Sequence, residues 1–176
     1  MDSKNHKNNF AYIDVANLHN AIESFGWKLD YARFRIWLKD KYHVSRAYLF
    51  IGLIPKNASL YKYLQESGFT LVFKETVYDH NGKPKGNCDA DLVVQAMQDL
   101  YEGNSDKMII VSSDGDYASL VKLLKEKDRL EVILSPAIAE KCSILLKRLN
   151  VNISYLWQQK SNIELKEKAP DGDKTP

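Results

Sequence analysis

The sequence KGNCDADLVVQAMQDLYEGNSDKMIIVSSDGD, which spans residues 85–116, sets the organisation of this chain. Its first half has the apolar spacing of an amphipathic helix, and its second half contains an apolar run typical of a strand buried on both faces. Asp89 and Asp91 stand at the start of the helix, and Asp114 and Asp116 follow the strand. This stretch therefore predicts one helix-and-strand unit that carries carboxylates at the helix start and at the strand end.

A fifth acid, Asp14, directly follows the apolar run FAYI at residues 10–13. A strand that ends in aspartate places a carboxylate at the carboxyl edge of a parallel sheet, where such folds keep their ligand sites. Converging carboxylates raise one another's pKa and destabilise the fold unless positive charge lies among them. Oxygen ligands without a histidine or cysteine cluster favour Mg²⁺ or Mn²⁺ over Zn²⁺ or Cu²⁺. We therefore expect an acidic cleft that holds a hard divalent cation and handles phosphates.

The rest of the chain alternates between strand and helix patterns, which indicates right-handed crossovers and a parallel sheet. In the common doubly wound order 3-2-1-4-5, strands one and four are neighbours, so that Asp14 and Asp114 would face each other. The predicted fold class is a three-layer α/β/α sandwich with a mainly parallel sheet in that order. We expect strands over residues 10–14, 47–53, 69–77, 107–112 and 130–134, an edge strand over 152–155, and helices over 17–25, 31–41, 58–66, 89–101, 116–127 and 137–149.

The composition is that of one soluble globular domain. The chain has 176 residues, of which 44% are hydrophobic and 27% are charged. No apolar run approaches the ~20 residues that span a bilayer, and the polar start MDSKNHKNNF lacks the apolar core of a signal peptide. We expect a domain over residues 10–157, a charged and disordered tail over 158–176, and a location in the cytoplasm.

Composition also restricts the partners and metals. Cys88 and Cys142 lie far apart and form no CxxC pair, so neither a disulfide framework nor a zinc module is indicated. The formal net charge of +2 argues against the dense basic surface of a high-affinity, non-specific DNA binder, but it leaves room for a local basic rim. We expect no membrane association, and the sequence leaves the oligomeric state open, a homodimer included.

Each acid, taken alone, also has a purely structural interpretation. Asp89 heads the apolar stripe of its helix and could serve only as a helix cap, whereas Asp91 lies on another face and is typical of a solvated position. Asp116 could be a cap, and Asp14 and the segment from Asp114 to Asp116 could be turns. Three loop acids at one edge of the sheet are hard to ascribe to capping, and together they favour a site.

The other polar residues near these acids carry weaker signals. Asn17 could cap the first helix or offer its amide to a metal-bound water or a phosphate, and Ser112 and Ser113 could bind phosphate or end the strand. Lys83 and Lys85 lie in a basic loop with an Asn-Gly turn and could steer a polyanion, although charged loops are usually only solvated.

Three sequence blocks together resemble a known family. The blocks are YIDVAN at residues 12–17, KGNCDADL at 85–92 and SSDGDY at 112–117, and they resemble the signature blocks of LabA-like NYN domains within the PIN-like nuclease superfamily. The resemblance covers residues 10–156 and includes the order of the blocks. It implies a PIN-like α/β fold, and a divalent metal held by Asp14, Asp89, Asp114 and Asp116 that serves to cut RNA phosphodiesters.

The resemblance also marks two departures and one match. Asn17 matches the conserved amide beside the first acid. Ser113 stands where the family commonly has glycine, and a side chain there could crowd the backbone beside Asp114. Asp91 stands where the family often has another residue, so its role is open.

Two functions follow as hypotheses. The first is a Mg²⁺- or Mn²⁺-dependent ribonuclease in which Asp14 and Asp114 bind metal directly, Asp89 and Asp116 complete the site, and Lys83 or Lys85 holds a flanking phosphate. The second is a non-catalytic module that binds RNA, a nucleotide or a protein through the same cleft. A haloacid-dehalogenase type phosphatase is disfavoured, because Ala16 stands where that enzyme needs a second acid. The RNA substrate, the choice between endonuclease and exonuclease, and the number of metals stay open.

Overall fold

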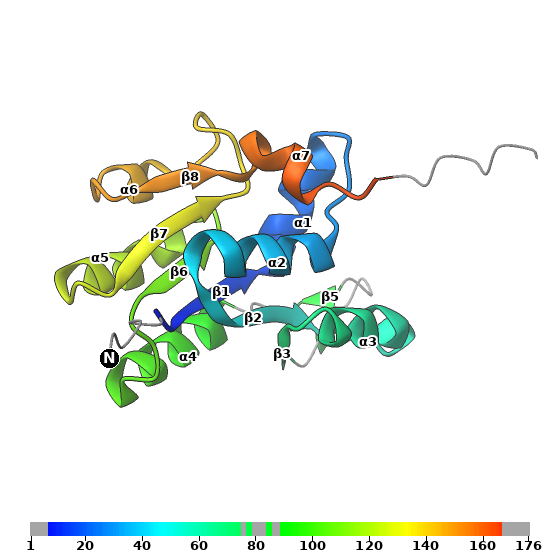
Figure 1. The fold of residues 1–176 in the computed structure, drawn as a ribbon, viewed down its shortest axis with the longest axis horizontal. Helices are drawn as coiled ribbons and strands as arrows, with labels where there is room; N and C mark the ends of the chain where they lie inside the picture. The colour runs from blue at the N-terminus through cyan, green and yellow to red at the C-terminus, as the bar shows by residue number, and fades with distance from the viewer. Residues whose placement is uncertain (1–6, 75–76, 79–83, 86–88, 167–176) are drawn as a thin grey trace, which may run out of the picture.

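A six-stranded parallel sheet forms the centre of the computed structural model, which describes residues 7–74, 77–78, 84–85 and 89–166 (Figure 1). Every neighbouring pair of strands in this sheet is parallel. The strands are, in spatial order, β3 (Thr70–Lys74), β2 (Val44–Gly52), β1 (Asn9–Asp14), β6 (Met108–Val111), β7 (Leu130–Ser135) and β8 (Ile153–Tyr155). The predicted order 3-2-1-4-5 is confirmed, and β8 extends it as a sixth strand at the edge.

Helices cover both faces of the sheet, which confirms the three-layer architecture (Figure 1). Successive residues of β1 point into opposite cores, as the alternation of a strand requires. Ala11 and Ile13 join one core, and Phe10 and Tyr12 join the other. The first core includes α1 (Val15–Ser24), α2 (Tyr31–Tyr42) and α3 (Ala58–Glu66); the second includes α4 (Asp89–Glu102), α5 (Ala118–Glu126) and α6 (Ile144–Lys147).

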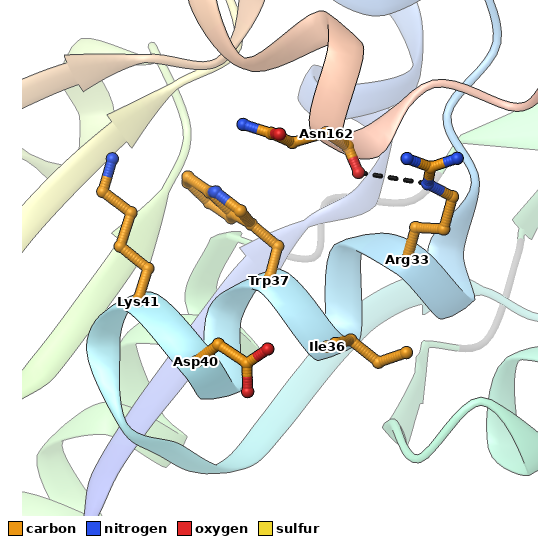
Figure 2. Close-up of a pocket in the computed structure, with 6 residues that line it drawn as sticks. All are labelled: Arg33, Ile36, Trp37, Asp40, Lys41 and Asn162. Carbon is orange, nitrogen blue, oxygen red and sulfur yellow. Dashed lines mark hydrogen bonds between the residues drawn. The ribbon is translucent and has the colours of Figure 1, made fainter.

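The last helix, α7 (Lys160–Ile163), follows the short 3₁₀ helix η3 (Leu156–Gln159) and packs against α2. The Arg33 guanidinium donates to the carbonyls of Ser161 and Asn162, and Figure 2 shows the second of these bonds. Ile163 is fully buried in the first core. The predicted domain end at residue 157 stays a prediction, and residues 160–163 beyond it are part of the packed structure.

One predicted helix is largely wrong. Of residues 137–149, only α6 is an α-helix. The residues before it form a turn that is hydrogen-bonded to the loop after β6. The Ser143 amide donates to the Ser113 carbonyl at 3.1 Å, and the Ser143 hydroxyl caps α6 by accepting from the Leu145 amide. A continuous helix would bind the Ser143 amide to its own fourth preceding carbonyl instead.

The remaining differences are small. The helix expected from Asp116 begins as a 3₁₀ turn, η2 (Gly115–Tyr117), and continues as α5. The strand expected over residues 69–77 is the shorter β3, and Val77–Tyr78 (β4) instead pairs with Pro84–Lys85 (β5) in a separate antiparallel ribbon. Cys142 is buried as a free thiol, whereas Cys88 lies outside the described residues. Among the described residues, no helix has the length and apolar character needed to cross a membrane.

Candidate metal centre

Two neighbouring strands bring the first acids together at the carboxyl edge of the sheet. Ile13 of β1 is in register with Val111 of β6, so Asp14 and Ser112 follow at the same level. The Ser112 hydroxyl donates to Asp14 Oδ2 at 3.5 Å and accepts from the Asp114 amide at 3.1 Å. Ser112 is fully buried, so it joins the two aspartate segments and offers no surface to a substrate.

Asp14 combines a capping role with a place in the acidic group. Its Oδ1 accepts from the Asn17 amide at 3.0 Å and thereby caps α1. Its side chain is only 6% exposed. Burial raises the pKa of this carboxyl above the ordinary value; the Asn17 amide opposes the shift, and the negative charge of Asp89 adds to it.

Tyr117 connects Asp14 to Asp89, the first residue of α4. Its hydroxyl lies 2.6 Å from Asp89 Oδ1 and 3.2 Å from Asp14 Oδ2. A phenol has one hydrogen, so the shorter contact marks Asp89 as its main acceptor. Burial and the bond to Asp89 raise the pKa of Tyr117 far above its ordinary value, so the hydroxyl keeps its proton. The sequence pattern places Tyr117 only among apolar positions, yet a buried tyrosine hydroxyl usually requires a partner, and this is the signal that could have indicated its role.

The other three acids form the tightest group. One carboxylate oxygen from each of Asp89, Asp114 and Asp116 lies within 4.8 Å of the others. Asp114 caps η2 by accepting from the Asp116 amide at 3.0 Å, and this bond turns Asp116 back toward the group. Asp14 lies beside this group through Tyr117 and through its electrostatic coupling to Asp89 and Asp114.

This donor set fits a hard divalent cation. All of its ligands are carboxylate oxygens, which suit Mg²⁺, Mn²⁺ or Ca²⁺ better than zinc or copper. Within the described residues, no lysine or arginine forms an ion pair with Asp14, Asp114 or Asp116. Burial also keeps Asp14 from being screened by water. A cation would therefore supply to Asp14, Asp114 and Asp116 a positive charge that no described lysine or arginine provides through an ion pair.

Asn17 is held in one orientation beside the acids. Its Oδ1 accepts from both the amide and the hydroxyl of Ser113, each at 2.9 Å. Because a backbone N–H can only donate, the atom that faces it is the oxygen, and the NH₂ group of Asn17 is directed elsewhere. The Ser113 side chain thus supports Asn17, and crowding of the Asp114 backbone by it stays a prediction.

The other predicted site residues have less support from the structure. Asp91 is half-buried and is not a member of the group formed by Asp89, Asp114 and Asp116. Lys83 lies outside the described residues, and only the backbone of Lys85, in β5, is described.

A groove of about 1190 Å³ leads away from the acids. Asp14, Asp89 and Asp114 line one part of it, and the groove continues between α1 and α3 to Trp27 and Leu165. A smaller hollow of about 460 Å³ lies between α2 and α7, where Arg33, Trp37 and Asn162 are among its lining residues (Figure 2). Among the described residues that line it, Asp40 is the only carboxylate, so the hollow lacks the donors of a metal centre.

Comparison with known proteins finds a family model that matches most of the chain. The model of the NYN domain matches residues 10–149. A crystal structure of a protein of unknown function from Vibrio parahaemolyticus is similar, with a TM-score of 0.72 and 23% identity over 94% of this chain and 100% of the other. This likeness concerns the fold alone. A search of curated proteins found no match.

Proposed function

Because this chain belongs to the NYN domain family, within the PIN-like nuclease superfamily, we propose that it is a metal-dependent ribonuclease of the LabA-like type. The family supports a hydrolase that acts on nucleic acid. The observation that carries the proposal is the meeting of carboxylate oxygens from Asp89, Asp114 and Asp116 within 4.8 Å, beside the buried Asp14. Mg²⁺ or Mn²⁺ is the proposed cofactor, and the cytoplasm is the proposed location.

The residues have separate proposed roles. Asp14, Asp89, Asp114 and Asp116 would hold the cation, which when bound lowers the pKa of water and offsets negative charge on the phosphoryl group. The Asn17 NH₂ group, oriented by Ser113, would donate to a phosphate oxygen. Lys83 and Lys85 would bind a flanking phosphate. Tyr117 and Ser112 would act as positioning residues that keep the aspartates in place.

Cleavage of an unstructured RNA oligonucleotide in Mg²⁺ or Mn²⁺ tests this proposal. Loss of a residue that only supports a metal ligand typically costs up to about a hundredfold in activity. Asp114 is proposed to bind the metal directly, so we expect Asp114→Asn to reduce the cleavage rate by more than that. Asp40→Asn, at an exposed acid outside the group, is the matched control and should cleave at the wild-type rate. Equal rates in D114N and the wild type would point to a contaminating nuclease and overturn the assignment.

Thermal unfolding with Mn²⁺ separates the enzyme from a non-catalytic module. A cation that binds only the folded state stabilises it, by about 2.7 kcal/mol at a hundred times its Kd. We expect Mn²⁺ to raise the Tm of the wild type and of D40N but not that of D114N. No stabilisation of the wild type by Mn²⁺ near neutral pH would favour the non-catalytic module.

A further inference from the structure

The groove beyond the acids has a different chemistry from the metal centre. Its lining between α1 and α3 is largely apolar and aromatic, with Trp27, Ile54, Leu60 and Tyr63 among the residues there. Leu60 is 41% exposed and Tyr63 is 39% exposed, so large apolar surfaces face solvent inside a hollow. Lys28 and Glu23 lie on the same lining, and their opposite charges offset each other. This part of the groove is therefore not a row of basic side chains that would bind phosphates.

The aromatic walls are held in place by the fold. The Tyr63 hydroxyl accepts from the Ala32 amide and donates to Asp30 Oδ1, each at 3.4 Å, and these long contacts orient the ring toward the start of α2. Trp27 packs on the first hydrophobic core while part of its side chain stays accessible. Rigid aromatic faces that are already exposed lose little conformational freedom when a flat ligand stacks on them.

The groove is continuous with the proposed metal centre, and it is longer than one nucleotide. It follows α1 from Asp14 past Glu23 to Trp27, and ten helical residues rise about 15 Å. Even an extended single strand, whose phosphates lie about twice as far apart as the ~3.4 Å axial repeat of a stacked duplex, would place more than one nucleotide in this length. Its volume of about 1190 Å³ exceeds the roughly 300–1,000 Å³ of pockets for single small ligands.

We propose that the groove between α1 and α3 is a nucleobase subsite, in which unpaired bases next to the cleaved bond pack against Leu60, Tyr63 and Trp27. The inference rests on the proposed ribonuclease function and adds a binding site to it. Every base offers a π face, so such a subsite tolerates many sequences. Bases inside a duplex cannot reach recessed aromatic rings, so the subsite selects single strands.

Binding of a labelled oligoadenylate, measured by fluorescence anisotropy with EDTA in the non-cleaving D114N background, tests the subsite. Loss of one stacking partner costs about 1–3 kcal/mol, so we expect Tyr63→Ala to raise Kd about fivefold or more. Leu60→Ala should also weaken binding. Tyr101→Ala and Ile36→Ala are matched controls at side chains 94% and 59% exposed outside the groove, and both should leave Kd unchanged.

Two further measurements test whether the protein binds the bases of the oligonucleotide and not only its backbone, and whether the bases contact Trp27 directly. An abasic strand of equal length and a blunt duplex should both bind more weakly than the oligoadenylate. The oligoadenylate should quench tryptophan emission in D114N and in its Trp157→Phe derivative, but much less in its Trp27→Phe derivative. Unchanged Kd in both groove variants, or equal binding of the abasic strand, would overturn the subsite. Failure of the ribonuclease proposal would instead appear as absent cleavage by the wild type while base-dependent binding persists.

Discussion

At the scale of single residues, capping and metal binding are compatible roles of the same carboxylate. Asp14 uses Oδ1 to cap α1, and its Oδ2 faces Ser112 and Tyr117. Asp114 likewise uses Oδ1 to cap η2 while it takes part in the acidic group. The capping bonds fix the side-chain torsions, so the carboxylates are positioned before any cation binds. A capping role therefore does not argue against the proposed metal-binding role of the same aspartate.

The buried charge of Asp14 should make the metal-free fold less stable at neutral pH. Its pKa is raised in the folded state, so the folded protein holds the proton more tightly than the unfolded chain, whose value is near 3.8. Stability therefore falls as the pH rises from about 3.8 through the higher folded pKa, and it stays low above that window. An uncharged asparagine side chain in its place would still cap α1, because asparagine is as good a cap as aspartate.

We therefore expect Asp14→Asn to raise the Tm in EDTA by a few degrees near pH 8 and by much less near pH 4, since ~1 kcal/mol moves the Tm of a chain this size by ~2–4 °C. The same variant should lose RNA cleavage. Thermal melts at the two pH values measure the effect, and Asp40→Asn serves as the exposed control. A D14N protein less stable than the wild type at pH 8 would show that the Asp14 charge is compensated in the fold.

At the scale of elements, local patterns predicted what local interactions determine. The helix predicted over residues 58–66 is α3, and Asp30 caps α2 through the Arg33 amide as expected. The pattern over residues 137–149 failed because the Ser143 amide binds the Ser113 carbonyl, a partner thirty residues away in sequence. The role of Tyr117 was missed for the same reason. Sequence placed this residue on a buried face but could not identify which side chains its hydroxyl would meet.

The contact between the α6 turn and the Asp114 loop predicts a sensitive glycine. A methyl group added at Gly115 would collide with the Ser143 hydroxyl and would approach Leu145 Cδ1 to 3.1 Å. Ser143 cannot easily move, because its hydroxyl caps α6. We expect Gly115→Ala to displace the loop and to reduce cleavage by about tenfold or more, since small misplacements of catalytic groups are costly.

A double variant separates this collision from other effects of the alanine. Ser143→Gly removes the colliding hydroxyl and side chain, so G115A/S143G should cleave faster than G115A alone. The rate constants of the four proteins, including S143G by itself, complete a double-mutant cycle. Additive effects of the two substitutions would contradict a direct contact between Gly115 and Ser143 as the cause.

At the scale of the whole molecule, the strand order creates the site. The order β3-β2-β1-β6-β7-β8 places β1 beside β6, and this single adjacency brings Asp14 next to the loop that carries Asp114 and Asp116. Alternation of strands and helices was enough to predict the adjacency, since few orders are common in such folds. Composition was a weaker guide to the end of the domain. The segment after residue 157 is mostly charged and polar, yet its Ile163 is buried in the first core.

The position of α7 yields a prediction about where the folded unit ends. Ile163 is fully buried, Arg33 binds the carbonyls of Ser161 and Asn162, and Glu164 pairs with Leu29 in an isolated bridge. Removing a buried isoleucine side chain usually costs about 2–5 kcal/mol. A chain ended after residue 157 should therefore melt at least about 5 °C below a chain ended after residue 166, whereas the latter should match the full chain.

Ile163→Ala in the full chain should reproduce most of the loss in melting temperature, because the buried Ile163 side chain is its main cause. Equal melting temperatures for the chains ended after residues 157 and 166 would instead place the domain end at 157, as composition predicts.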